Sequence, residues 1–165
     1  MNQMTLQELY EVGCSFESSV GQGTKSERAR IPKNSSRINL GEELTNNIIN
    51  YDKKINFLVS GEIWCPDFQL NAALLKRFMD LNTNFDMSVI TMARGKKFLQ
   101  PILNIEDAKY PLIVVLDEDF NILGTFQERP QIVKDAPSFD DIKLDYYKGK
   151  YLLDSANDIW KIINK

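Results

Sequence analysis

The sequence INFLVSGEIWCPDFQLN, residues 55–71, joins an apolar run to an amphipathic one through a short turn. The run from Ile55 to Val59 predicts a short buried strand. Pro66 suits the first position of a helix, because an N–H group at that position has no acceptor within the helix and its absence costs no hydrogen bond. We therefore predict a helix from Pro66 to about Leu81, with Trp64 and Cys65 in the turn that precedes it.

A lone thiol at the start of a helix has a specific chemical meaning. The backbone N–H groups and the positive dipole end favour the thiolate form of Cys65, whereas the nearby carboxylate of Asp67 opposes it. Because these two effects have opposite signs, we expect a mildly activated thiol. The alternative is that Cys65 is an inert, small apolar residue. Phe68 stands three residues after Cys65, so this turn has no Cys-x-x-Cys pair.

Composition narrows the class of protein. The 165 residues are 43% hydrophobic and 26% charged, as in an ordinary single domain. A net charge of −3 gives no reason to expect a nucleic-acid or membrane partner. The start of the chain lacks the pattern of a signal peptide, and no apolar run approaches the roughly 20 residues of a membrane span. We expect a cytoplasmic protein, whose two cysteines are free.

The chain contains no histidine, which has consequences for catalysis and for metal binding. A Cys-His pair is impossible within this chain, and the commonest zinc ligand is missing. We therefore expect no metal site. A phosphate-binding glycine-rich loop is also absent, and we expect no cofactor.

The first 38 residues are predicted to form a helical extension followed by a basic loop. Thr5 and Glu8 have the spacing of a capping box, and a helical pattern continues toward Gly21. The segment 21–37 is polar and basic, which favours a solvated loop; the alternative is a rim that attracts anionic thiols or partners. Residues 39–165 are expected to form the main domain, with the whole chain folding as one unit.

The rest of the chain alternates strands with helices. Asn39 and Glu42 suggest a second capping box, and Asp154 suggests the start of a final helix. This order predicts a parallel core with an antiparallel edge. The predicted segments are a helix to about residue 51, a strand over 86–92, a helix over 96–103 broken by Pro101, a central strand over 112–116, and a hairpin strand over 122–127.

The position of Trp64-Cys65 at the first strand-to-helix turn, and of Tyr110-Pro111 before a later strand, resembles the thioredoxin fold. That resemblance implies an α/β architecture, with a central mixed sheet flanked by helices and, here, an N-terminal helical extension. It also implies that the peptide bond before Pro111 is cis and that Pro111 faces Cys65.

The resemblance extends to a group of bacterial single-cysteine thioredoxin-like proteins. These carry Trp-Cys-x-Asp, then a residue other than cysteine, and an asparagine four positions after the aspartate. In this chain the pattern is met by Trp64, Cys65, Asp67, Phe68 and Asn71. The segments 117–121 and 128–131 fit the same group loosely.

Departures from a dithiol thioredoxin limit the expected activity. Val59 occupies the place of a buried aspartate, and Tyr110 occupies that of the threonine beside the cis-proline. Without a second thiol and that acid, we do not expect general disulfide reductase activity.

The resulting hypothesis is a monothiol protein that exchanges disulfides through Cys65. Its partners would be protein disulfides or low-molecular-weight thiols, with an outside thiol, or Cys14, resolving the mixed disulfide. The alternatives are a non-catalytic thioredoxin-fold adaptor and a Cys14–Cys65 redox switch, and the oligomeric state is open. The candidate catalytic residues are Cys65 and Asp67, and the candidate substrate-binding residues are Trp64, Asn71, Tyr110 and Pro111.

Asp67 and Asn71 each have a second interpretation. Asp67 suits the first turn of a helix because its charge complements the dipole, and Asn71 could face solvent. Cys14 could be a core residue or could have a redox role.

Overall fold

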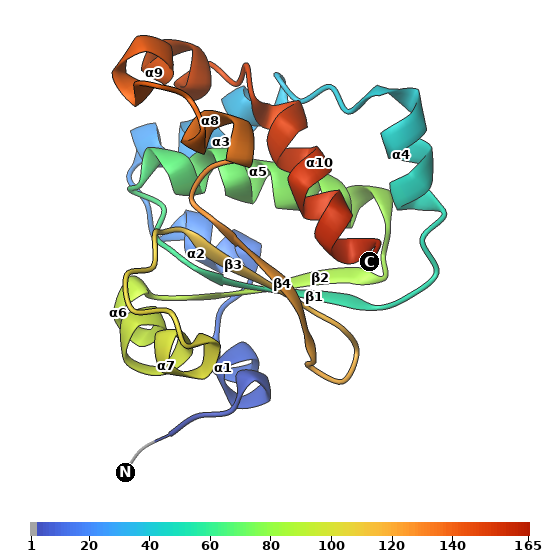
Figure 1. The fold of residues 1–165 in the computed structure, drawn as a ribbon, viewed down its shortest axis with the longest axis vertical. Coiled ribbons are helices and arrows are strands. Elements are labelled where there is room, and N and C mark those ends of the chain that lie inside the picture. Colours follow the sequence, from blue (N-terminus) through green and yellow to red (C-terminus); the bar gives the residue numbers. More distant parts are fainter. Residues whose placement is uncertain (1–2) are drawn as a thin grey trace.

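The computed structural model describes residues 3–165 and contains a four-stranded sheet covered by helices on both faces (Figure 1). The strand order is β2-β1-β3-β4. This arrangement confirms the predicted mixed sheet flanked by helices. The strands are β1 (Ile55–Ser60), β2 (Phe85–Ile90), β3 (Leu112–Leu116) and β4 (Ile122–Gln127).

The helices form one thick and one thin layer. In Figure 1, α3, α4, α5, α8, α9 and α10 lie above the sheet, whereas α1, α6 and α7 lie below it. Their bounds are α1 (Leu6–Val12), α2 (Phe16–Gly21), α3 (Lys25–Ser35), α4 (Gly41–Ile49), α5 (Pro66–Leu81), α6 (Met92–Arg94), the π-helical turn η1 (Gly95–Leu99), α7 (Gln100–Leu103), α8 (Gln131–Lys134), α9 (Phe139–Tyr147) and α10 (Leu152–Ile163).

Strand directions differ from the predicted parallel core. Only β1 and β2 are parallel, whereas β1 pairs with β3, and β3 with β4, in antiparallel fashion. Ser60 is opposite Ile90 of β2 and Leu112 of β3, so the chain leaves β2 and enters β3 at the same end of the sheet. The helices between β2 and β3 therefore do not cross to the opposite end of the sheet, as a connection between parallel strands must, and β3 runs antiparallel to β1.

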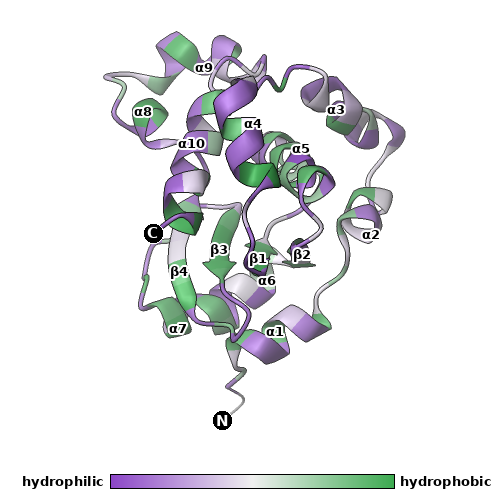
Figure 2. Ribbon diagram, turned by 90° about the vertical axis from the view of Figure 1, so that its right-hand side faces the viewer, coloured by the Kyte–Doolittle hydropathy of each residue, from purple (hydrophilic) through white to green (hydrophobic). Residues whose placement is uncertain are grey.

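Alternation along the strands divides the apolar core in two. Phe57 and Val59 face α5 and pack with Phe68, whereas Leu58 faces the other way and packs with Leu9. Both clusters are buried because successive side chains of a strand point to opposite faces. Figure 2 shows the hydrophobic colour concentrated on the strands and the inner side of α5.

The prediction of a basic loop over residues 21–37 is wrong, because helix α3 occupies most of this segment. Thr24 caps α3: its hydroxyl accepts from the Glu27 N–H, and the Glu27 carboxylate accepts from the Thr24 N–H. Ile31 and Asn34 of this helix are buried. The spacing of Thr24 and Glu27 is a capping-box signal that the high charge of the segment obscured.

Two other predicted caps do not form. Asn39 accepts a hydrogen bond from the N–H of Gly41, where α4 begins, and α4 has no side-chain cap. Asp154 lies within the first turn of α10, which begins at Leu152.

The connection from β2 to β3 also begins earlier than predicted. Thr91 caps α6, so β2 ends at Ile90 and Met92 is helical. The helical run then continues through Pro101 to Leu103. Just before Pro101, the Gln100 N–H donates a π-type hydrogen bond to the Gly95 carbonyl. Pro101 itself lies at the start of α7, where a residue without an N–H group is tolerated.

The N-terminal extension packs on both faces of the sheet. Leu9 of α1 is fully buried in the lower core. Cys14 forms an antiparallel bridge with Val89, with N–O distances of 2.9 and 2.8 Å. No helix in the described part of the chain combines the length and apolar character needed to cross a membrane.

Candidate functional site

The loop between β1 and α5 is built around a buried glycine. The Gly61 N–H donates to the Ile90 carbonyl at 3.0 Å. A Cβ atom on Gly61 would lie 2.7 Å from Phe68 Cδ1 and 3.1 Å from Pro111 Cβ. Only glycine allows the first turn of α5 and Pro111 to approach this loop so closely.

Cys65 is the N-cap residue of α5, as predicted from Pro66. Its N–H donates to the Glu62 carbonyl at 3.0 Å, which fixes the turn. The Cys65 side chain is partly buried and makes no capping hydrogen bond. Neither cysteine is in a disulfide.

The electrostatics of Cys65 differ from the expected mild activation. Burial is the largest effect and raises the pKa of the thiol, and the carboxylates of Asp67 and Glu128 raise it further. The backbone N–H groups of Phe68 and Asp67 act in the opposite direction. The net result is a pKa above the ordinary value, because burial penalises the charged thiolate more than the helix end favours it.

Trp64 and Pro111 are the predicted binding residues that border this turn. The Trp64 side chain is 56% exposed, next to Cys65. The Tyr110–Pro111 peptide bond is cis, as the resemblance implied. Trp64 therefore gives the cysteine an exposed aromatic neighbour, whereas Pro111 is buried against Gly61 of the same loop.

Tyr110 does not present its side chain to the turn. Its ring belongs to the lower core, whereas Cys65 packs against the upper core on the other face of the sheet. The Tyr110 hydroxyl donates to Gln100 Oε1, and Lys96 Nζ lies 6.0 Å from the ring centroid. Only the backbone of Tyr110 is therefore placed to contribute to the candidate site.

Asn71 is buried rather than part of a binding surface, with 1% exposure. Its Nδ2 donates to the Glu128 carbonyl at 2.9 Å, while the Glu128 N–H donates to the Pro111 carbonyl at 2.9 Å. Glu128 has a φ of 66°, a conformation that is uncommon for a residue with a side chain. Asn71 thus holds this turn of the chain beside Pro111.

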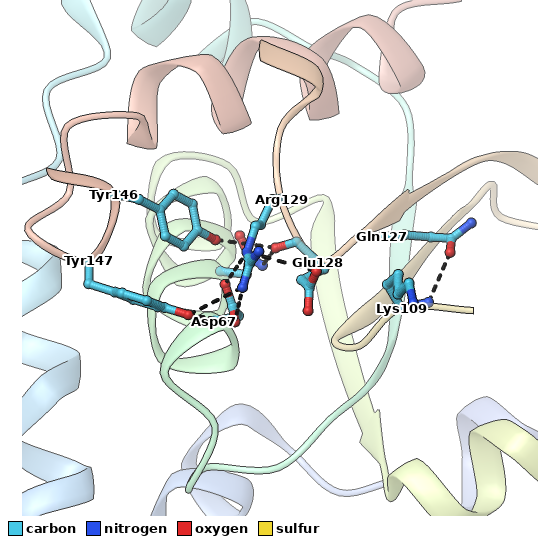
Figure 3. Close-up of polar contacts among 8 residues, drawn as sticks. Asp67, Lys109, Gln127, Glu128, Arg129, Tyr146 and Tyr147 are labelled. Atoms are coloured by element: carbon cyan, nitrogen blue, oxygen red, sulfur yellow. Dashed lines mark hydrogen bonds and ion pairs between the residues drawn. The ribbon is translucent and has the colours of Figure 1, made fainter. Parts of the chain in front are cut away.

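Asp67, a predicted catalytic residue, is occupied by an ion pair. Its carboxylate accepts from Arg129 Nε at 3.1 Å and from the Tyr147 hydroxyl at 3.1 Å. The Asp67 and Arg129 side chains are only 7% and 20% exposed. Figure 3 shows Arg129 between Asp67 and Tyr146, with the Tyr147 hydroxyl directed at Asp67.

Aromatic rings complete this arrangement. The guanidinium carbon of Arg129 lies 3.6 Å from the centre of the Phe139 ring and 5.5 Å from that of Tyr146. We call Asp67, Arg129, Phe139, Tyr146 and Tyr147 the arginine clamp. It ties the start of α5 to the chain that follows β4 and to α9, which is a structural role.

Glu128 is the site residue that sequence reasoning missed. Burial raises the pKa of its carboxyl, Asp67 raises it further, and Arg129 opposes the shift. Its carboxylate also raises the pKa of the Cys65 thiol, so the two groups lie in the same electrostatic environment. The sequence signal at Glu128 is the loose fit of residues 128–131 to the single-cysteine group. Its place beside the turn depends on the contacts with Asn71 and Pro111.

Cys14 lies close to the loop between β1 and α5. It lines a cavity of about 50 Å³ together with Gln22, Gly61, Glu62 and Ile63 among others. Burial raises the pKa of the Cys14 thiol as well. Within residues 3–165, no group of three or more His, Cys, Asp or Glu side chains is placed to hold a metal ion.

Similarity to known proteins agrees with this geometry. A family model described as Thioredoxin matches residues 13–143. A Pseudomonas aeruginosa protein of unknown function is 33% identical, with a TM-score of 0.91 over 99% of this chain and 98% of that chain. An HIV epitope-scaffold is 34% identical, with a TM-score of 0.90 over 98% of each chain. No curated protein matches the chain.

Proposed function

The chain belongs to the thioredoxin family, and from this premise we propose that it exchanges disulfides through a single cysteine, Cys65. The observation that carries the proposal is the position of Cys65 at the start of α5, next to the exposed Trp64 and in a loop whose Gly61 approaches Pro111. The partners would be protein disulfides or low-molecular-weight thiols of the cytoplasm.

The reaction would proceed in two balanced steps. Cys65 loses its proton, and its thiolate attacks one sulfur of a partner disulfide, forming a mixed disulfide as the other sulfur leaves as a thiolate and takes up a proton. A second thiol from outside the chain then attacks the mixed disulfide and releases Cys65. Phe68, which is fully buried, stands where a dithiol protein has its resolving cysteine.

The raised pKa makes this exchange slow at neutral pH. Only the thiolate is nucleophilic, and burial of Cys65 raises the pKa of its thiol and so lowers the thiolate fraction below that of an ordinary cysteine. A thiol of raised pKa is also a poorer leaving group, and α5 carries no neighbouring resolving thiol. Both features favour a long-lived mixed disulfide over rapid turnover. The protein would then act on a few bound partners rather than as a general reductase.

A non-catalytic binding protein is the second candidate, and the raised thiol pKa favours it. The ion pair of Asp67 with Arg129 points the same way, because it removes the nearest carboxylate from any role in proton transfer. In this alternative the surface around the exposed Trp64 would hold a partner without a sulfur exchange.

The test is mixed-disulfide formation with glutathione disulfide as the probe. The Cys14→Ser protein is incubated with the probe and the adduct is mapped by intact and peptide mass, with Cys14→Ser/Cys65→Ser as the control. We expect one adduct, on Cys65, that added glutathione removes. An unmodified Cys65 after prolonged incubation at pH 8.5 would instead support the binding protein.

A further inference from the structure

A positively charged helix lies beside the reactive turn. A Cβ atom on Gly23, just before α3, would lie 2.9 Å from Ile63 Cγ1, so this end of α3 packs against the turn that carries Cys65. At the other end, Arg77 of α5 donates to the Ser35 carbonyl at 3.1 Å. Helix α3 therefore runs along α5 in the same direction, from the reactive turn outward.

The outer face of α3 is cationic. Lys25 and Arg28 are neighbours three positions apart, as are Arg30 and Lys33. Lys25, Arg28 and Lys33 are exposed, whereas Ile31 and Asn34 are buried against the rest of the molecule. Arg30 lies at the edge of this face and is partly exposed. Figure 2 shows α3 mostly in the hydrophilic colour. We call Lys25, Arg28, Arg30 and Lys33 the cationic face.

The cationic face has no acidic partner within the described part of the chain, where no ion pair includes any of its four residues. Glu27, the acid of this helix, is engaged with the Thr24 N–H at 2.8 Å. The nearby Glu17 pairs with Lys76. A local excess of cations in a chain of net charge −3 is suited to an external anion.

We propose that the cationic face docks an acidic segment of a partner protein and thereby brings the partner's disulfide to Cys65. This inference rests on the proposed function and names the partner class for the same site. The 11 residues of α3 span about 16 Å at 1.5 Å per residue. An extended segment of about five residues covers that length, and because alternate side chains share one face, about three carboxylates can reach the cationic face at once.

The proposal is tested with peptides that react at one cysteine. Each peptide of about 12 residues carries its cysteine as a mixed disulfide with thionitrobenzoate, so that attack by Cys65 forms a Cys65–peptide disulfide and releases the coloured thiolate. The acidic peptide has Asp and Glu, and the neutral peptide has Asn and Gln at the same positions. Rates are measured on the Cys14→Ser protein at low and high salt.

The charge-reversal variant is Lys25→Glu/Arg28→Glu. Acidic residues are well tolerated in the first turn of a helix, so folding is expected to persist and is checked by circular dichroism. The matched control is Lys53→Glu/Lys161→Glu, which makes the same change in net charge at exposed positions. Lys53 precedes β1 and Lys161 lies in the last turn of α10, both at the other end of the sheet from Cys65.

We expect the acidic peptide to react about tenfold faster than the neutral one at low salt, with the advantage lost near 1 M salt. The charge-reversal variant should lose this advantage, and the control should keep it. Equal rates for both peptides, or an advantage that survives charge reversal, would overturn the inference. An equal advantage for a small anionic disulfide such as dithionitrobenzoate would overturn the assignment to protein partners.

The proposed function and this inference fail in different ways. If Cys65 reacts with neither peptide, the exchange proposal is wrong, and docking is then measured with a dye-labelled acidic peptide that lacks cysteine. Tighter binding to the parent protein than to Lys25→Glu/Arg28→Glu would support the cationic face, and equal binding would contradict it.

Discussion

The Cys65 thiol experiences opposing forces from groups within a few residues and from groups far along the chain. The helix end supplies backbone N–H groups that favour the thiolate, but burial and two carboxylates outweigh them. Glu128 is one of these carboxylates, brought to the site by Asn71 and Pro111. Removing its charge should therefore change the reactivity of Cys65.

The Glu128→Gln change is expected to lower the pKa of the Cys65 thiol. One like charge at high dielectric contributes less than about 1 kcal/mol, so the alkylation rate at pH 7 should rise about threefold. The measurement is the pH profile of iodoacetamide alkylation on a Cys14→Ser background. Glu118→Gln, in the exposed turn between β3 and β4, is the control. A slower rate in Glu128→Gln would mean that Glu128 accepts the thiol proton instead.

Glu128 also links reactivity to stability. Because its folded pKa is raised, its contribution to stability is present below its usual pKa of about 4.3 and is lost as the pH rises through the folded value. The neutral Glu128→Gln side chain does not undergo this loss. The variant is therefore expected to be at least as stable as the parent at pH 7, which makes it a safe test of reactivity.

The ion pair of Asp67 and Arg129 makes a second prediction at this scale. Asp67→Asn removes the nearer of the two carboxylates that pair with Arg129, leaving only Glu128 at 3.8 Å, and should lower the free energy of unfolding by about 2 kcal/mol. Arg129→Gln should have a similar effect. Urea unfolding of both single variants and the double variant measures the coupling energy, which should exceed about 1 kcal/mol. If the two single changes in the free energy of unfolding simply add in the double variant, Asp67 and Arg129 do not stabilise the fold through their interaction.

At the scale of elements, α3 illustrates how a cap can decide the structure of a charged segment. Its buried Ile31 and Asn34 lie against α5, and Thr24 fixes where the helix begins. Composition alone suggested a loop. The cap and the packing of the buried face against α5 favour a helix instead, and they outweigh the preference of a charged segment for a loop.

Thr24→Ala removes the hydroxyl that accepts from the Glu27 N–H and should lower the free energy of unfolding by about 1 kcal/mol. Thr83→Ala, at an exposed position between α5 and β2, is the matched control and should have little effect. Denaturant midpoints measure both. Equal midpoints for the two variants would mean that the capping box does not stabilise α3 in solution.

At the scale of the whole molecule, the N-terminal extension is packed into both layers rather than appended to them. Leu9 fills the lower core, Cys14 pairs with the outer edge of β2, and α3 covers α5. We expect the chain to unfold in a single cooperative transition. Separate unfolding of the extension would require opening both cores.

Leu9→Ala should lower the free energy of unfolding of the whole chain by about 3 kcal/mol, because it leaves a cavity beneath the sheet. Leu144→Ala, whose side chain is 76% exposed, is the control and should change stability by less than about 0.5 kcal/mol. Circular dichroism and fluorescence of Trp64 and Trp160 should give coincident urea curves. A tryptophan transition that is unmoved by Leu9→Ala would show that the extension is a separate unit.

The sequence by itself determined the features that depend on neighbouring residues. Local periodicity located β1, β3 and the late hairpin, and Pro66 marked the start of α5. The resemblance based on Trp64-Cys65 and Tyr110-Pro111 anticipated both the fold and the cis bond. The predictions of strands and of the helix start succeeded because strand pattern and helix start are set within a few positions along the chain, whereas the fold and the cis bond were implied by the resemblance.

Only the tertiary structure decided the direction of β3, the burial of Asn71 and the state of Cys65. Asp67 meets Arg129 across 62 positions, and the Asn71 side chain meets the Glu128 carbonyl across 57. Whether a carboxylate near a cysteine activates it, suppresses it or pairs elsewhere depends on partners that no local spacing reveals. Desolvation of the thiol likewise arises from the packed surroundings as a whole, which is why sequence predicted the position of Cys65 but not its pKa.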